Sequence, residues 1–240
     1  MKFQIPLEEA QLEQRYKRFL ADVQTLDGQK ITIHCPNTGS MKNCAPPASR
    51  VWFWDSKNDK RKYPCTWELV EIDHQFLACI NTQRANGLVV EALNNDVIEQ
   101  LTGYQSLKTE VKYGHENSRV DILLSDHETQ ATCYVEVKNV TLMGSNGQGY
   151  FPDAVTTRGT KHLRELVQMV EEGHRAVLLF CVAHTGIRKV SPAWDIDPTY
   201  AKCLQWAITK GVEVLAYSVS ISLTQMVMDQ QVPFDIGKAG

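Results

Sequence analysis

The sequence has little of what marks membrane-spanning, secreted or zinc-binding proteins. Its longest uninterrupted apolar run, Ala176–Ala183, is far shorter than the ~20 residues that a membrane-spanning helix needs. The opening MKFQIPLEEAQ carries acidic residues where a secretory signal has an apolar run, so we expect a cytoplasmic protein with no membrane partner. None of the seven cysteines forms a C-x-x-C pair, and their odd number favours reduced thiols over a disulfide framework or a zinc site.

An excess of positive charge is also missing. The net charge is −3, so bulk electrostatics do not indicate a nucleic-acid partner, and any anion-binding site must be a local patch. Internal repeats and low-complexity tracts are absent as well. The 240 residues, 22% of them charged and 43% hydrophobic, are typical of a globular protein with one large domain or two ordinary ones.

Residues 16 to 81 contain short strand-like segments and no convincing long helix. Asp27-Gly28 is a strong hairpin signal between two of these segments. About five strands with turns between them suit a small barrel, and we predict an OB-like one. The polar stretch 81–87 ends it, which predicts an OB-like nucleic-acid-binding domain over 1–82 and a second domain over 83–240. The predicted strands are Phe19–Leu26, Gln29–Cys35, Arg50–Asp55, Cys65–Ile72 and Phe76–Asn81.

Aromatic and basic residues are interleaved in this first segment. Aromatic side chains beside cations are how OB-like barrels hold single-stranded nucleic acid. The candidate contacts are Arg18, Lys42, Arg50, Trp52, Lys60 and Arg61. Trp52 and Trp54 share one strand face and Phe53 points the other way, so at least one of these faces is simply core.

Beyond residue 87, helical and strand-like patterns alternate. Apolar residues recur at helical spacing over Leu88–Leu101, and Gly103 ends that segment. Together with the hairpin described next, this order predicts an α/β domain with a mixed sheet. The other predicted elements are a helix from Thr156 or Thr157, a buried strand over Arg175–His184, a helix over Pro198–Lys210 and a strand over Val212–Val219, followed by a short mixed tail.

The stretch Ser118–Lys138 predicts two short strands joined by a polar turn. Its period-two pattern is typical of half-buried strands. A hairpin symmetric about Glu128-Thr129 puts Asp121 opposite Glu136 and Leu123 opposite Tyr134 on one face. The other face is wholly apolar, with Val120, Ile122, Leu124, Cys133, Val135 and Val137.

Facing carboxylates on a strand pair repel each other unless a cation lies between them. Carboxylate oxygens are ligands that Mg²⁺ and Mn²⁺ prefer, alongside waters and substrate phosphates. Lys138 projects on the same face as Glu136, so Asp121, Glu136 and Lys138 together suggest a phosphodiesterase centre. The alternative is a solvent-facing hairpin with scattered charges. Glu91 is either a third acid of this centre or a charge favourable to the start of its own helix.

The helix that follows this hairpin begins with cations. Arg158, Lys161 and His162 lie in its first turns, where they oppose the positive end of the helix dipole. Helix N-termini bind phosphates, so we predict nucleic-acid contacts at these positions. Salt bridges to Asp153 or Glu165 are the alternative.

Over essentially its full length the chain resembles the sugar fermentation stimulation protein family. The motifs that carry the resemblance are PNTGSM (36–41), VKYG (111–114), SRVD (118–121), YVEVKNVTL (134–142), FPDA (151–154) and TRGTKHLREL (157–166). The resemblance implies an OB-like domain followed by a PD-(D/E)XK nuclease-like domain. It also implies DNA binding in a bacterial cytoplasm and a link to regulating sugar, particularly maltose, metabolism.

The nuclease pattern maps onto particular residues of this chain. Asp121 matches its first acid, Glu136 its second acid and Lys138 its lysine, while Glu91 matches an acid supplied by the preceding helix. One departure is Val120, which stands where the pattern has proline.

Two functions remain open from the sequence. The first is a DNA nuclease in which Asp121, Glu136, the Val137 carbonyl and Glu91 hold Mg²⁺ or Mn²⁺. The second is a non-catalytic DNA-binding regulator that keeps a nuclease-like fold. The intact D…ExK pattern favours retained chemistry, because facing acids repel phosphate and serve no purpose in mere binding. Single-stranded or duplex DNA, and a monomer or a homodimer, are both open. Nothing in the sequence demands a sugar-modifying enzyme.

Overall fold

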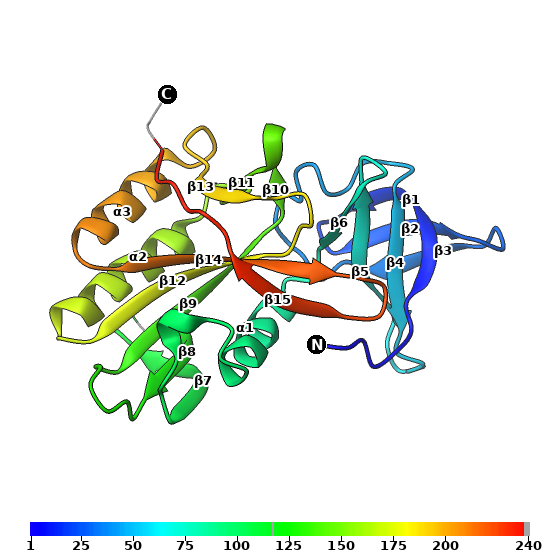
Figure 1. Cartoon of the computed structure of the whole chain (residues 1–240). Helices are drawn as coiled ribbons and strands as arrows, with labels where there is room; N and C mark the ends of the chain where they lie inside the picture. The colour runs from blue at the N-terminus through cyan, green and yellow to red at the C-terminus, as the bar shows by residue number, and fades with distance from the viewer. Residues whose placement is uncertain (117, 238–240) are drawn as a thin grey trace.

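The first unit of the computed structural model is a closed barrel of strands, on the right of Figure 1. The structure describes residues 1–116 and 118–237. The strands pair in the order β3-β2-β1-β4-β5-β6, and a contact between His34 of β3 and Thr66 of β5 closes the first five into a barrel. Their bounds are β1 Glu8–Tyr16, β2 Leu20–Thr25, β3 Lys30–His34, β4 Arg50–Asp55, β5 Cys65–Ile72 and β6 Phe76–Cys79.

The strands β2 to β6 lie where the sequence predicts strands, but β1 was not predicted. Only Ala10 and Leu12 of β1 are fully buried, and glutamate and glutamine, which strands disfavour, make up most of the rest. Pairing with β2 and β4 on its two sides holds this polar segment extended. Tertiary pairing therefore overrides a weak local pattern.

The second unit is built on a mixed sheet with the order β15-β14-β12-β9-β8-β7. The central strands β9, β12 and β14 are parallel, and β7, β8 and β15 are antiparallel to their neighbours. The bounds are β7 Ser106–Tyr113, β8 Ser118–Ser125, β9 Cys133–Val140, β12 Arg175–Val182, β14 Glu213–Ile221 and β15 Met226–Gln231. A small second sheet contains β10 Leu142–Met143, β11 Gln148–Phe151 and β13 Lys189–Pro192.

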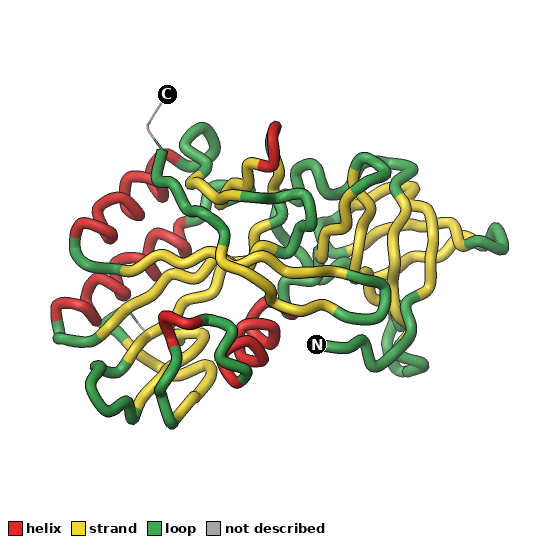
Figure 2. Tube along the Cα trace, viewed as in Figure 1, coloured by secondary structure: helices red, strands yellow, loops and turns green. Residues whose placement is uncertain are grey.

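Helices cover both faces of the mixed sheet, and Figure 2 shows them confined to this second unit. The helix α1 (Arg84–Asn94) packs on one face in a core that contains Ile122, Val135 and Leu179. The helices α2 (Thr157–Glu171) and α3 (Pro198–Thr209) pack on the other face. The predicted α/β architecture with a mixed sheet is thus observed.

Several predicted boundaries differ from the observed ones. The segment expected as one helix over 88–101 is α1 followed by a separate 3-10 turn, η1 (Glu99–Leu101), because the chain turns at Asn95 and Asp96. A second short 3-10 turn, η2, spans Ser145–Gly147. The edge strands β7 and β15 were not predicted, since each is half polar and is held by pairing with a neighbour.

The barrel and the α/β unit share packing rather than a loose linker. Trp52, Leu69 and Cys79 of the barrel belong to the same core as α1, and the Cys79 amide donates to the carbonyl of Ala183 at 2.9 Å. Glu68 of β5, which is fully buried, accepts from Nε of Arg84 at 2.6 Å. The two units are therefore held in a set orientation.

No helix within residues 1–116 and 118–237 combines the length and the apolar character needed to cross a membrane.

Candidate active site

The hairpin of β8 and β9 has the register that the sequence predicts. Leu123 pairs with Tyr134, and Ile122 with Val135. The backbone pairing ends there, because the amide of Val137 donates to Oδ2 of Asp121 at 2.8 Å. A side chain thus replaces the main-chain acceptor where the two strands diverge.

The apolar face of this hairpin is only partly as predicted. Ile122, Leu124 and the three apolar residues of β9 pack in the α1 core. Val120 is also buried but lies in the other core, beside Tyr113 and Leu163. Burial thus alternates along the whole of β8, but its buried side chains join different cores on the two sides of Asp121.

Glu136 lies next to Asp121 and is almost completely buried, with 1% of its surface exposed. Its Oε1 accepts hydrogen bonds from Nζ of Lys138 and from Nδ1 of His162. Arg158 donates from Nε to Nε2 of the same imidazole at 3.2 Å, which leaves the imidazole proton on Nδ1, facing Glu136. The other carboxylate oxygen of Glu136, Oε2, is buried with no hydrogen-bond partner among the described residues.

The two carboxyl groups have opposite pKa shifts. Burial, together with the charge of Glu136, raises the pKa of Asp121 above its ordinary value. Burial alone would raise the pKa of Glu136 too, but the ammonium of Lys138 and the hydrogen bond with His162 hold it below its ordinary value. The charge of Glu136 therefore disfavours a second charge on Asp121.

The residue of α1 that reaches this centre is Asn86 rather than Glu91. The Nδ2 atom of Asn86 donates to Oδ1 of Asp121 at 2.9 Å. Glu91 instead accepts from the amino group of Met1, and its side chain is 42% exposed. The third acid expected from this helix does not join the centre.

Two motif loops that are far apart in the sequence meet beside the centre. The Ser40 hydroxyl and the Met41 amide donate to Oδ2 of Asp153 at 3.0 and 2.9 Å. A cavity of about 230 Å³ lies between these loops and the centre, lined by Asn37, Asn86, Lys138 and Asp153 among others. The barrel therefore supplies one wall of the cleft that leads to Lys138.

The cations at the start of α2 have separate roles. Arg158 is exposed next to the centre. Lys161 donates to the backbone carbonyl of Glu116. His162 is 4% exposed and bound to Glu136, so it belongs to the acidic centre and does not face solvent as a phosphate contact would. This corrects the expectation for His162.

Two of the barrel candidates are already engaged in the fold. Trp52 is 3% exposed and packs in the core, so it offers no surface for stacking. Arg50 is paired with Glu9 at 2.9 Å and with Glu71 at 3.0 Å, and it covers the Trp52 ring. Burial therefore contradicts the stacking role expected of Trp52, whereas a phosphate contact by Arg50 would have to compete with two carboxylates.

The remaining barrel candidates lie at the surface. Arg18 and Lys42 are exposed, and Arg18 lines a hollow that also contains Asp153 and Thr156. Lys60 is exposed in the loop between β4 and β5. Arg61, in the same loop, covers the ring of Trp54. Arg18 and Lys42 thus line hollows next to the cleft.

Known families match both units of the chain. The model of the sugar fermentation stimulation protein RE domain matches residues 83–225, and that of the SfsA N-terminal OB domain matches residues 14–80. The chain belongs to the sugar fermentation stimulation protein family. Among its relatives, the sugar fermentation stimulation protein homolog of Shewanella frigidimarina is 60% identical over 222 residues, which cover 92% of this chain and 94% of the relative.

More distant family members agree with this fold. The homolog of Marinomonas sp. is 54% identical over 233 residues, covering 97% of this chain and 90% of its own length. The solved structure of Pyrococcus furiosus SfsA in complex with Ca²⁺ has a TM-score of 0.85 at 24% identity and covers 98% of both chains. The predicted fold, an OB-like barrel followed by a nuclease-like α/β unit with a mixed sheet, is confirmed.

Two features of the centre were not predicted from the sequence. They are the contact of Asn86 with Asp121 and the contact of His162 with Glu136. Asn86 lay in a stretch interpreted as a polar bridge between domains, and α1 begins two residues before it. His162 shares the TRGTKHLREL motif with Arg158, and its four-residue spacing from Arg158 places both on one helix face. That spacing was the available signal.

Proposed function

We propose that this protein is a phosphodiesterase that acts on DNA and depends on a divalent cation. The observation that carries the proposal is the meeting of Asp121 and Glu136 where β8 and β9 diverge, with Lys138 hydrogen-bonded to Glu136. Burying two mutually repelling carboxyl groups costs stability in a metal-free protein. A centre that holds a cation between them recovers that cost, which gives the arrangement a purpose.

The donor set fits a hard cation such as Mg²⁺ or Mn²⁺. Oε2 of Glu136 is buried and has no hydrogen-bond partner among the described residues, and Asp121 lies beside Glu136 with a raised pKa. Within the described part of the chain no three His, Cys, Asp or Glu side chains are placed to hold a metal ion together, so the ligands the protein offers are Asp121, Glu136 and the Val137 carbonyl. Mg²⁺ is commonly held by one or two carboxylates, with waters and substrate phosphates completing its shell.

The bound cation supplies Lewis-acid polarisation of the scissile phosphate and a lowered pKa for its water. That a relative from Pyrococcus furiosus was solved with Ca²⁺ supports a divalent cation in this family. In this chain, Asn86 and the Val137 amide orient Asp121, and His162 orients Glu136. Lys138, with 14% of its side chain exposed, neutralises negative charge that develops on the reacting phosphate.

The DNA strand enters through the cleft between the barrel and the α/β unit. Arg158 and Lys42, both exposed, bind neighbouring phosphates, together with Arg18. The further phosphate contacts in this proposal are Lys60, Arg61 and Lys161. DNA handling is then the means by which the protein contributes to regulating sugar, particularly maltose, metabolism.

A second candidate is a DNA-binding regulator that does not turn over. The observation in its favour is that Glu91 is paired with the amino group of Met1, which leaves the centre with only two acids. A regulator needs the cleft and the phosphate contacts. It does not need Asp121 in the buried position beside Glu136 that raises the pKa of Asp121.

The decisive experiment incubates purified protein with labelled single-stranded DNA, duplex DNA and RNA, with Mg²⁺, Mn²⁺ or EDTA. Asp121→Asn, purified in the same way, controls for contaminating nucleases. We expect metal-dependent cleavage by the parent and none by Asp121→Asn. Binding of DNA without cleavage under any of these conditions would favour the regulator.

A further inference from the structure

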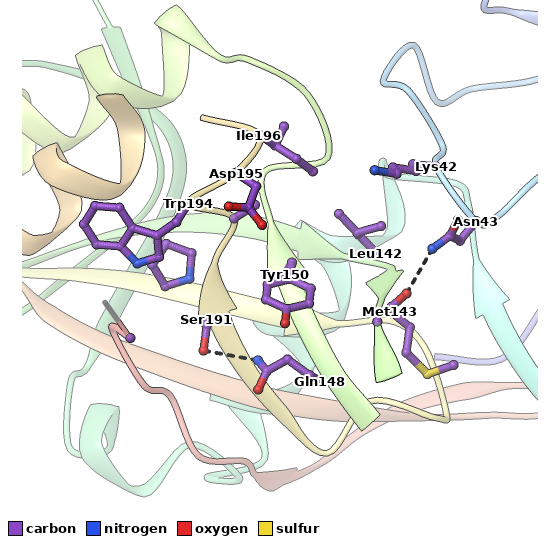
Figure 3. Close-up of a pocket in the computed structure, with 14 residues that line it drawn as sticks. Lys42, Asn43, Leu142, Met143, Gln148, Tyr150, Ser191, Trp194, Asp195 and Ile196 are labelled. Carbon is purple, nitrogen blue, oxygen red and sulfur yellow. Dashed lines mark hydrogen bonds between the residues drawn. The ribbon is translucent and has the colours of Figure 1, made fainter. Parts of the chain in front are cut away.

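A larger pocket of about 480 Å³ opens beside the active-site cleft (Figure 3). The small sheet of β10, β11 and β13 and the segment after β13 form most of its wall, and the barrel contributes Lys42 and Asn43. Its volume lies in the range of about 300–1,000 Å³ that is typical of ligand sites. Of the residues used in the proposed function, only Lys42 lines it.

Two aromatic side chains line this pocket and are held by contacts of their own. The Tyr150 ring packs against the bare backbone of Gly144, where an added Cβ would come within 2.7 Å of a ring carbon. Trp194 is half-buried, and its Nε1 donates to the carbonyl of Ile236 at 2.8 Å. Rings that are fixed in this way provide stacking surfaces without a large entropy loss on binding.

The pocket also contains polar groups with unused hydrogen-bonding capacity. Gln148 donates from Nε2 to Oγ of Ser191 at 3.1 Å, which leaves its Oε1 directed to other partners. The carboxylate of Asp195 and the ammonium of Lys42 form no ion pair or side-chain hydrogen bond with any described residue. The walls of the pocket therefore combine two aromatic rings, the hydrogen-bond acceptors of Gln148 and Asp195, and the cation of Lys42.

This pocket adjoins the cleft of the acidic centre. Leu142 and Tyr150 line both spaces, and Lys138 lines the cleft on the other side of them. When the backbone of a bound polymer passes Lys138, the next monomer unit of that polymer can therefore lie against Tyr150.

We propose that this pocket holds one unstacked nucleobase of the strand whose backbone runs past the acidic centre, which rests on the function proposed above. A phosphate in the pocket would be repelled by Asp195, whereas the amino group of adenine, cytosine or guanine donates to such a carboxylate. Tyr150 and Trp194 stack on the base, and Lys42 binds its phosphate. The pocket thereby selects an unpaired nucleotide next to the cleaved bond.

The test compares two single strands of equal charge, an oligodeoxyadenylate of about ten nucleotides and an abasic strand of the same length, within the site size of an OB fold. Binding is measured in EDTA, so it does not require cleavage. We expect Trp194→Leu to reduce the preference for the base-bearing strand by roughly 5-fold or more, the scale of one lost aromatic–base stack. Affinity for the abasic strand should be unchanged.

Two further variants guard against a trivial loss of folding. Tyr150→Phe keeps the ring and should keep the preference. Trp206→Leu removes a 40% exposed tryptophan of α3 outside the pocket and should also keep it. If Trp194→Leu and Trp206→Leu show the same preference as the parent, no base occupies this pocket.

The outcomes separate this inference from the proposed function. A parent that cleaves DNA but shows no Trp194-dependent preference refutes the pocket and leaves the nuclease proposal standing. A Trp194-dependent preference without any cleavage supports the pocket and refutes turnover. Binding of a neutral glucose disaccharide that Trp194→Leu abolishes, with the strand preference unaffected, would make this a carbohydrate pocket instead and overturn the inference.

Discussion

Glu136 is contacted by groups from separate elements, and its burial makes each of them matter. Lys138 shares its strand, Asp121 lies on β8, and His162 approaches from α2. Because a buried carboxylate loses its hydration, its charge is retained only with partners such as Lys138 and His162. The chemistry proposed for this centre depends on that balance.

Removing the lysine should affect turnover and spare binding. We expect Lys138→Ala to slow single-turnover cleavage of saturating DNA by on the order of 100-fold or more, because its ammonium acts on charge that develops in the transition state. DNA affinity should change little, since interactions made only in the transition state do not contribute to ground-state binding. Lys108→Ala, on the exposed edge strand β7, is the matched control. Parental cleavage by Lys138→Ala would exclude a catalytic role for this lysine.

Replacing the first acid should stabilise the metal-free protein. The raised pKa of Asp121 means that its carboxyl group contributes stability below its unfolded-state pKa and that this contribution is lost as the pH rises through the folded-state pKa. Asp121→Asn should therefore melt at a higher temperature than the parent at neutral pH in EDTA, and the difference should shrink as the pH falls towards 3.8, the ordinary pKa.

Adding Mg²⁺ or Mn²⁺ should reverse that order. A cation that binds only the folded parent raises its melting temperature by mass action, whereas Asp121→Asn should respond much less. Melting curves that are identical with EDTA and with millimolar metal would count against a metal centre at Asp121.

At the scale of elements, the contact between β5 and α1 holds the cleft together. Glu68 is fully buried and accepts from Arg84, from Nε1 of Trp54 at 2.9 Å and from the Asn81 side chain at 3.0 Å. Asn86 follows Arg84 on the first turn of α1, so the same contact sets where Asn86 meets Asp121.

Breaking this ion pair from one side should destabilise the fold. We expect Arg84→Met to lower the free energy of unfolding by about 3 kcal/mol, the lower end for removing one partner of a buried pair, because 29% of the Arg84 side chain is exposed. Adding Glu68→Gln should recover much of the loss, since a neutral amide needs no counter-charge. Denaturant titrations measure the free energy of unfolding of the single and the double variant. An Arg84→Met variant as stable as the parent would show that the ion pair contributes little.

In the molecule as a whole, some exposed cations are unpaired and others are committed to ion pairs of the fold. Among the described residues Lys42 and Arg158 form no ion pair; Lys42 lies in the barrel and Arg158 at the start of α2, beside the acidic centre. Arg50 is already paired with Glu9 and Glu71. The shared core of Trp52, Leu69 and Cys79 also means that the intact chain is the proper object for binding experiments.

The salt dependence of DNA binding should separate these groups. Lys42→Ala and Arg158→Ala should each reduce the slope of log affinity against log salt by about 0.7 to 0.9, the change for one phosphate contact. Arg50→Ala should leave the slope unchanged, because its charge is neutralised within the barrel. Equal slopes for all variants would mean that the strand does not run along the proposed cleft.

The bounds of two barrel strands and the register of one hairpin follow from the local sequence. The strands Arg50–Asp55 and Cys65–Ile72 have the bounds predicted from it, and the register that aligns Leu123 with Tyr134 follows from the alternation on either side of one polar turn. Local sequence decides these features because side chains two residues apart share a strand face. The motif spacing likewise indicated the family.

Which distant residues meet depends instead on how the helices and the sheet pack together. Asn86 reaches Asp121 and His162 reaches Glu136 because α1 and α2 pack on opposite faces of one sheet, and no local pattern encodes that contact. The burial of Trp52 depends on α1 in the same way. Contacts between segments far apart in the chain depend on how faces pack together, whereas a sequence pattern reports only which face each residue occupies.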